Sequence, residues 1–185
     1  MQTAKQTLSP EAYLFMERAS LDKHEYLYET VIPMAGASRI HNIIAGNLFA
    51  LLWAFLRKSE AVVFQNDMRV YNPLNDSYIY PDVVISDGKP IVSDVFKDNL
   101  LNPLVIIEIL SPSTALHDKT DKFIACRSMP TLKEYILISP EIRQTEIYQK
   151  DDEGHWTVQS FLPDAMLQIT AISFSCELQD IYEKV

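Results

Sequence analysis

The sequence predicts a single α/β domain, in which helices flank a mixed sheet and extra strands follow at the C-terminal end. The predicted order of helix, several strands, helix and strand is typical of this class. A length of 185 residues suits one domain, residues 1–185, with its own core. Hydrophobic residues make up 48% and charged residues 22%, the balance of a folded globular protein.

The N-terminal part is predicted to form a short helix, an extended arm and a long helix. Ser9 followed by Pro10 is an N-cap and first-turn pair that begins a helix reaching about Ala19. The segment His24–Pro33 alternates loosely and predicts a short strand or hairpin arm. From His41 to about Lys58 apolar residues recur at helical spacing, which predicts a helix with its cations at the C-terminal end.

The middle of the chain is predicted to be mostly strands. Two runs rich in β-branched residues and bounded by turn residues give the best patterns, Tyr78–Ser86 and Pro103–Leu110. Shorter strands are predicted at Ala61–Gln65 and Met68–Tyr71. The segment from about Asp87 to Asn102 is long and polar, and is predicted as a loop.

The C-terminal third is predicted to contain one helix and three strands. The sequence Ser111-Pro112-Ser113 ends the preceding strand and caps a helix from about Thr114 to Ser128. A buried strand follows at Leu132–Ile138. The segments Ile142–Gln149 and Trp156–Phe161 then predict a hairpin.

Composition excludes several classes of protein. The chain carries 16 basic and 25 acidic residues, a net charge of -9, which argues against non-specific coating of nucleic acid. Any contact with DNA must therefore be local or assisted by metal ions. Only Cys126 and Cys176 are present, so neither a disulfide framework nor a zinc cluster is expected.

The sequence favours a cytoplasmic location without a membrane span. The N-terminal residues lack the apolar core of a secretory signal. The longest unbroken apolar run, Leu48–Leu56, is far shorter than the roughly 20 residues that cross a bilayer.

One carboxylate, Glu108, stands in the middle of an apolar strand pattern. Side chains alternate along a strand, so Glu108 shares a face with Ile106 and Leu110, and a buried carboxylate there needs compensation. Asp82 begins the other strong strand, and the two acids converge if these strands pair. Two adjacent carboxylates are hard oxygen ligands, which suit Mg²⁺ or Mn²⁺. The pattern predicts a partly built metal site.

A lysine from the following helix is predicted to join these acids. Asp118 and Lys122 are four residues apart and stack on one helix face, which can look down on the strand end that carries Glu108. A metal ion and an ammonium group together would activate water and neutralise phosphate charge.

At this point the chain resembles the restriction endonuclease-like proteins of the PD-(D/E)XK nuclease superfamily, over nearly its whole length. The matching segments are Lys23-His24-Glu25-Tyr26, Met34–Ser38 with His41, Pro81-Asp82-Val83, Glu108–Ser113, Asp118–Lys122 and Glu134-Tyr135. The resemblance implies a restriction endonuclease-like core for the α/β fold.

The resemblance also implies roles for individual residues. Asp82 and Glu108 correspond to the motif acids and are expected to bind Mg²⁺ or Mn²⁺. The superfamily's lysine normally lies two residues after the glutamate, where this chain has Leu110. The lysine is therefore expected on the next helix. Lys122 is the first candidate there and Lys119 the second.

Two further residues are implied as supporting groups, and one position departs from the family pattern. Glu25 and His41 are candidates for the additional acid or polar group that the superfamily often uses. Glu29 stands where relatives tend to have glycine, so the arm near Glu25 is expected to differ.

The predicted function is a divalent-metal-dependent endonuclease that hydrolyses DNA, and by analogy a homodimer. A rival is a non-catalytic binding or assembly protein that keeps the nuclease fold, with Glu108 and Lys122 in an internal ion pair. A third alternative is a hydrolase of another phosphoester. Basic residues that could line a local DNA groove are Arg39, Arg57, Lys58, Arg69, Lys119 and Arg127.

Overall fold

The structure is a computed structural model that describes residues 7–93, 96–162 and 165–185. It contains two six-stranded sheets and a two-stranded ribbon. Sheet A consists, in spatial order, of β2 (Thr30–Pro33), β1 (His24–Leu27), β5 (Ser77–Ile79), β4 (Arg69–Asn72), β8 (Asn99–Leu100) and β7 (Val92–Ser93). Sheet B consists of β12 (Trp156–Phe161), β11 (Gln144–Lys150), β10 (Glu134–Ser139), β9 (Pro103–Ile109), β6 (Val83–Ser86) and β3 (Val63–Gln65).

Both large sheets are mixed. Among the strands of residues 7–93, 96–162 and 165–185, β4 and β8 are the one parallel pair of sheet A, and β9 and β10 that of sheet B. The ribbon pairs β13 (Met166–Ile169) with β14 (Phe174–Glu177). The helical segments are α1 (Pro10–Ala19), α2 (Arg39–Leu56), α3 (Ala115–His117), the π-helical η1 (Asp118–Lys122), α4 (Phe123–Cys126), the 3-10 turn η2 (Thr170–Ile172) and α5 (Leu178–Ile181).

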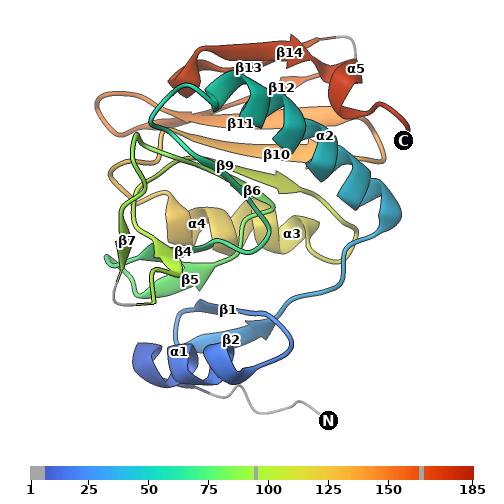
Figure 1. Cartoon of the computed structure of the whole chain (residues 1–185). Helices are drawn as coiled ribbons and strands as arrows, with labels where there is room; N and C mark the ends of the chain where they lie inside the picture. Colours follow the sequence, from blue (N-terminus) through green and yellow to red (C-terminus); the bar gives the residue numbers. More distant parts are fainter. Residues whose placement is uncertain (1–6, 94–95, 163–164) are drawn as a thin grey trace.

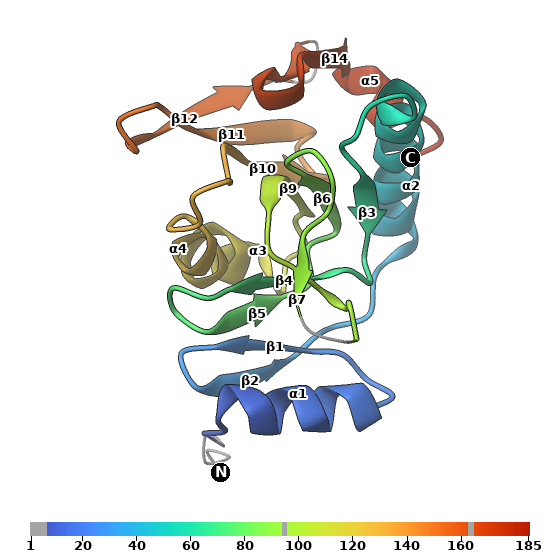
Figure 2. The same cartoon turned by 60° about the vertical axis from the view of Figure 1, so that its left-hand side comes forward.

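Helices cover both faces of sheet B. Figure 2 shows α2 on one side of β6, β9 and β10, and α3 and α4 on the other. The α2 face buries Ile44, Leu48 and Leu52 of the helix against the strands. Alternate strand residues on the opposite face, such as Ile106, pack against Phe123 of α4. The period of two along each strand therefore decides which helix a side chain meets.

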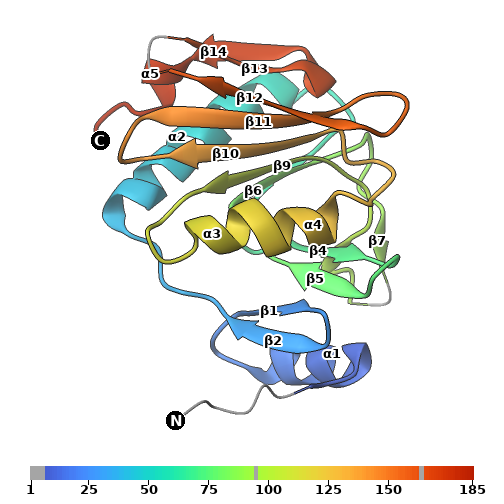
Figure 3. The same cartoon turned by 180° about the vertical axis from the view of Figure 1, so that it is seen from behind.

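The run α3–η1–α4 lies between the two sheets. Figure 1 shows sheet A with α1 at one end of the molecule and sheet B with the ribbon at the other, and Figure 3 shows this helical run over the strands of sheet B. The buried apolar cluster around this helical run includes Val70 and Ile79 of sheet A as well as Ile106 and Tyr135 of sheet B. A residue on this run can therefore contact both sheets.

The long helix α2 is apolar enough, with a mean hydropathy of 1.3 over 18 residues, to meet a length and composition test for a membrane span. Its residues Ile44, Ala45, Leu48, Leu52 and Leu56 are buried in the core cluster with sheet B. This packing is that of a core helix.

The mixed α/β class is confirmed, with two large sheets where one was predicted. The predicted strand Tyr78–Ser86 is two strands, β5 in sheet A and β6 in sheet B, separated at Tyr80-Pro81-Asp82. Pro81 has no N–H to donate to a ladder, which breaks the run there. The loop predicted at Asp87–Asn102 contains β7 and β8, apart from residues 94–95, which lie outside the described residues.

The arm and the C-terminal hairpin form as predicted. β1 and β2 pair antiparallel through a turn in which Tyr28 and Glu29 have φ of 51° and 61°. β11 and β12 form the predicted hairpin, with Thr145 opposite Phe161 at one end and Lys150 opposite Trp156 at the other.

Candidate active site

Strand pairing brings the two predicted acids together. β6 and β9 run antiparallel with Val83 opposite Ile107, so Asp82, just before β6, lies beside Glu108. The Asp82 N–H is 3.4 Å from Oε2 of Glu108, and the N–H of Ile109 donates to Oδ2 of Asp82 at 2.7 Å. Both carboxylates thus meet at the end of β9, on the face that α3–η1–α4 covers.

The ammonium of Lys122 reaches the same place from η1. Its Nζ lies 2.9 Å from Oε1 of Glu108 and 2.8 Å from Oε1 of Glu25. It also donates to the carbonyl oxygen of Tyr80 at 3.2 Å, with Oδ1 of Asp118 3.9 Å away. The side chain of Lys122 is only 4% exposed. The structure therefore joins Asp82, Glu108 and Lys122 in one buried cluster.

Glu25 enters the cluster from sheet A. Its Oε1 accepts a hydrogen bond from the N–H of Tyr80 at 3.1 Å, and its Oε2 lies 3.0 Å from Nε2 of His117. Burial acts to raise the pKa of Glu25, but the Lys122 charge and the hydrogen bonds from His117, Lys122 and Tyr80 outweigh it, so the pKa falls to about 2. Glu25 is therefore the permanent anion of the cluster.

Glu108 has the opposite electrostatic character. Burial raises its pKa well above the ordinary value, the charge of Lys122 opposes this, and repulsion from Asp82, Asp118 and Glu25 adds to it. Among the described residues Oε1 of Glu108 has no hydrogen-bond partner, although the Lys122 ammonium is close. A buried carboxylate oxygen without a hydrogen-bond donor is costly, and binding a proton or a cation reduces that cost.

The cluster carries an excess of negative charge. Burial alone would lower the pKa of Lys122, but Glu108, Glu25, Asp118 and Asp82 raise it well above its ordinary value. Lys122 therefore stays charged, and one ammonium faces these four carboxyl groups.

The donor set fits a hard divalent cation with few protein ligands. Within the described residues no group of three or more His, Cys, Asp or Glu side chains is arranged to hold a metal ion. Asp82 and Glu108 supply two adjacent carboxylates, and Mg²⁺ is commonly held by one or two carboxylates, with water and substrate phosphate completing its shell. Oε1 of Glu108 is paired with the Lys122 ammonium at 2.9 Å but has no hydrogen-bond partner among the described residues, so it retains the capacity to bind a cation.

Comparison with known proteins places this architecture in a family. The family model "Uma2: Putative restriction endonuclease" matches residues 10–179. The chain belongs to the Uma2 family. Two relatives come from Synechocystis sp. (strain ATCC 27184 / PCC 6803 / Kazusa). "Uncharacterized protein sll1609" is 35% identical over 168 residues, 91% of this chain and 93% of the relative. "Uncharacterized protein slr1290" is 30% identical over 176 residues, 95% and 91% of the two chains.

A solved structure shares the fold. It is the crystal structure of "a putative nuclease belonging to DUF820 from Anabaena variabilis ATCC 29413", with a TM-score of 0.77. The match covers 95% of this chain and 97% of the other, at 17% sequence identity. The likeness confirms the mixed α/β fold that the sequence predicts.

Within this Uma2 chain the two supporting candidates also lie at the cluster. Glu25 contacts Lys122 directly, as described above. His41, in the first turn of α2, places Nε2 3.0 Å from Oδ2 of Asp82. Its Nδ1 is buried and has no hydrogen-bond partner among the described residues. His41 therefore orients Asp82 from the α2 side, opposite Lys122.

Lys119, the second lysine candidate, lies outside the cluster. Its Nζ donates to Oε1 of Glu146 on β11 at 2.6 Å. Lys119 directly follows Asp118, and adjacent helix positions do not share a face, so it cannot lie on the stripe of Asp118 and Lys122. The expected supporting role of Lys119 does not agree with this placement.

Sequence reasoning missed two cluster residues, Tyr80 and His117. Tyr80 lies before Pro81, and that proline signals a break at which backbone groups leave the ladder and need other partners. His117 precedes Asp118 on the predicted helix, but only the fold shows that it faces Glu25. The π-helical η1 was also not predicted, and such segments are frequent at functional sites.

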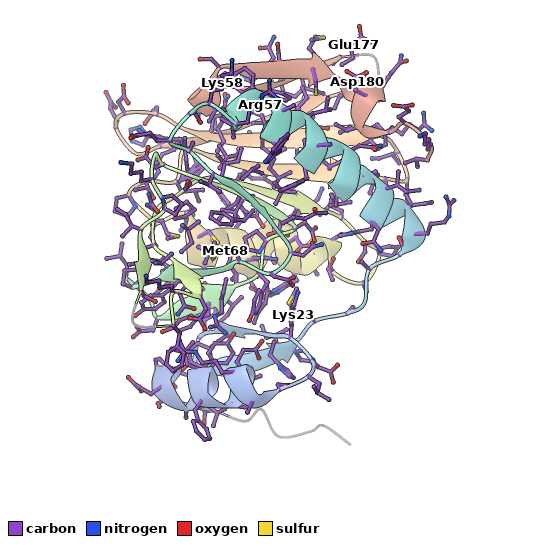
Figure 4. The ribbon with its side chains drawn as sticks, viewed as in Figure 1. Lys23, Arg57, Lys58, Met68, Glu177 and Asp180 are labelled. Atoms are coloured by element: carbon purple, nitrogen blue, oxygen red, sulfur yellow. The ribbon has the colours of Figure 1, made fainter. Side chains whose placement is uncertain are left out.

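Arg69 cannot line the predicted basic groove. It is 3% exposed and its Nη2 donates to Asp98 at 2.6 Å, so it is part of the interior. Figure 4 places Arg57 and Lys58, two others of the six, near the end of the molecule that also carries Glu177. These basic residues serve different parts of the fold.

Proposed function

We propose that this chain is a divalent-metal-dependent endonuclease that hydrolyses DNA phosphodiester bonds by attack of water. The observation that carries the proposal is the convergence of Asp82, Glu108 and Lys122, with Nζ of Lys122 2.9 Å from Oε1 of Glu108. Membership of the family described as "Putative restriction endonuclease" supports the reaction class.

Asp82 and Glu108 are the residues that would hold Mg²⁺ or Mn²⁺. When bound, such an ion lowers the pKa of water and neutralises charge on a phosphoryl group. It would also offset the acidity of the cluster, which otherwise repels phosphate.

The chain's own residues do three further tasks in this proposal. Lys122 is held at the site as a cation and stabilises negative charge that develops on the phosphate. Glu25 holds that cation at 2.8 Å from sheet A and remains an anion over the physiological range. The N–H of Ile109 and the ring of His41 hold the Asp82 carboxylate in one orientation.

One observation favours a second candidate, a non-catalytic binding or assembly protein. The Lys122 side chain is 4% exposed and lies between two carboxylates, which is the geometry of a closed internal ion network. Such networks perturb pKa values without any catalysis. In this alternative Glu108 and Lys122 determine only the packing of η1 between the sheets.

Cleavage of supercoiled plasmid in Mg²⁺ or Mn²⁺ separates the two candidates. The wild type should nick or linearise the plasmid only with metal, and Glu108→Gln should abolish this while the protein stays folded. The matched control is Lys119→Met, which removes another lysine ion pair on the same helical run and should leave cleavage intact. Equal cleavage by wild type and Glu108→Gln, or none by either, would remove the mechanism.

A homodimer is the assembly we propose for cutting both strands of a duplex, since each chain carries one such cluster. Sedimentation of the wild type at several concentrations tests it. A dimer that converts nicked plasmid to linear product is expected, and a monomer that only nicks would contradict the assembly.

A further inference from the structure

The three residues Tyr80-Pro81-Asp82 carry the chain from sheet A to sheet B. They belong to neither β5 nor β6, so the backbone groups of Tyr80 need partners outside the ladders. The structure supplies them from the site itself. The N–H of Tyr80 donates to Oε1 of Glu25 at 3.1 Å, and its carbonyl oxygen accepts from Nζ of Lys122 at 3.2 Å.

The phenol of Tyr80 is held by a second buried polar cluster. Its hydroxyl donates to Oε1 of Glu17 at 3.0 Å and accepts from Nη1 of Arg69 at 3.1 Å. Glu17 also accepts from the N–H of His24 at 3.0 Å, with Nδ1 of His24 3.0 Å from its other oxygen. Glu17 and Arg69 are 6% and 3% exposed.

The second cluster is itself rigidly attached to α1 and sheet A. Arg69 donates to Oδ1 of Asn99 at 2.5 Å and to Oδ2 of Asp98 at 2.6 Å. His24 directly precedes Glu25 on β1, so the same cluster also fixes the start of the strand that carries this acid. The proposed mechanism uses none of these groups.

We propose that Tyr80 is a positioning residue. Its phenol anchors the link between the two sheets, and its backbone N–H and carbonyl oxygen hold Glu25 and Lys122 in place. The same anchoring fixes the position of Asp82, which lies two residues further along the chain. This deepens the proposed function and depends on it for any effect on catalysis. The proposed positioning of Glu25, Lys122 and Asp82 by Tyr80 exists in the metal-free protein, so it can be tested without an activity assay.

Tyr80→Phe removes the hydroxyl and keeps the ring. The matched control is Tyr71→Phe, on β4 of sheet A. It removes a hydroxyl that donates to Oδ1 of Asp76 at 2.8 Å, a residue of neither polar cluster. The position of Asp82 is followed by amide hydrogen exchange at Ile109, whose N–H donates to the Asp82 carboxylate. The measured quantity is the ratio of the exchange rate of Ile109 to that of Ile107 in the same strand.

In Tyr80→Phe the exchange of Ile109 relative to Ile107 should accelerate about tenfold, because the Asp82 carboxylate loses its fixed place. In Tyr71→Phe the ratio should stay at the wild-type value. With Mn²⁺ and DNA, Tyr80→Phe should lower kcat about tenfold or more and leave KM within about twofold. A residue that only stabilises the fold would lower Tm and move neither quantity.

A second pair of variants covers the case in which Tyr80→Phe does not fold. Glu17→Gln keeps an oxygen that accepts from the phenol and should keep the wild-type exchange ratio, whereas Glu17→Met should raise it as Tyr80→Phe does. An exchange ratio in Tyr80→Phe or Glu17→Met equal to that of Tyr71→Phe overturns the inference. If the wild type cleaves no DNA, the proposed function fails, and the exchange ratios still decide this inference.

Discussion

The ammonium of Lys122 lies 2.8 Å from Oε1 of Glu25, a carboxylate on sheet A, whereas Glu108 is on sheet B. Lys122 therefore has a counterion that does not depend on Glu108. If a cation occupies the oxygens of Asp82 and Glu108, Lys122 keeps its charge and its place. This arrangement lets one buried lysine coexist with a metal site.

Loss of the Lys122 charge should destabilise the fold strongly. Lys122→Met removes the ammonium that lies between the buried carboxyl groups of Glu25 and Glu108 and leaves Glu25 with His117 alone as its cationic neighbour among the described residues. Removing one partner of a buried pair costs about 3–5 kcal/mol. Urea unfolding at neutral pH measures the change. The control Lys119→Met breaks the more exposed pair with Glu146 and should cost about 0–1 kcal/mol. Similar costs for both variants would contradict the assignment of Glu25 as a permanent anion.

The pair of His117 and Glu25 should make stability depend on pH. The hydrogen bond that His117 donates to Glu25 raises the pKa of His117 above its ordinary value of 6.5, against the effect of burial. The folded state therefore binds the proton more tightly than the unfolded state. The stabilisation is complete below about pH 6.5 and is lost as the pH rises through the folded pKa.

Unfolding free energies of wild type and His117→Gln between about pH 5 and pH 9 test this dependence. The difference between the two proteins should shrink toward high pH. His155→Gln, which changes an exposed histidine in the β11–β12 turn, should follow the wild type throughout. A difference that grows with pH would mean that His117 is bound in its neutral form.

Metal binding should compete with a proton on Glu108. Burial and repulsion from Asp82 raise the pKa of Glu108, so a proton binds there more tightly than usual and competes with a cation. Affinity for Mn²⁺ should therefore increase with pH. At about a hundredfold excess over Kd the wild type should gain about 2.7 kcal/mol in thermal unfolding. Glu108→Gln should lose this gain, and Glu146→Gln should keep it. A response that is the same in both variants would place the ion elsewhere.

The β1–β2 turn should be improved by glycine. Glu29 has φ of 61°, in the left-handed region that costs a residue with a Cβ about 1 kcal/mol. Glu29→Gly should therefore raise Tm by about 2–4 °C in a chain of this length. Glu29→Ala, which removes the charge and keeps the Cβ, should not. Equal changes in Tm would assign the effect to the charge.

Local patterns were enough to predict most elements of the fold but not their division into sheets. The β-branched run from Tyr78 to Ser86 looks continuous, because periodicity reports strand character and not the identity of the neighbouring strand. Pro81 was the one local signal that the run is divided. The two-residue strands β7 and β8 have too few residues to show alternation, and tertiary pairing with β4 determines them.

The site was predictable where chemistry and sequence spacing agree. Glu108 is a charge in an apolar strand, and Lys122 lies one helical turn after Asp118, so both could be chosen from the sequence. The partners of Glu25 could not be chosen from the sequence, because His117 reaches it from the helical run and Tyr80 from the link after β5. Contacts between sheets depend on topology that no local pattern encodes.

Anomalous scattering from a crystal soaked in Mn²⁺ would show directly whether Asp82 and Glu108 hold a metal ion beside Lys122. One strong peak is expected within about 2.5 Å of carboxylate oxygens of both Asp82 and Glu108, with Lys122 still against Glu25. A crystal with no peak there and Lys122 still between Glu25 and Glu108, or with the ion bound only by other residues, would rule out the metal site.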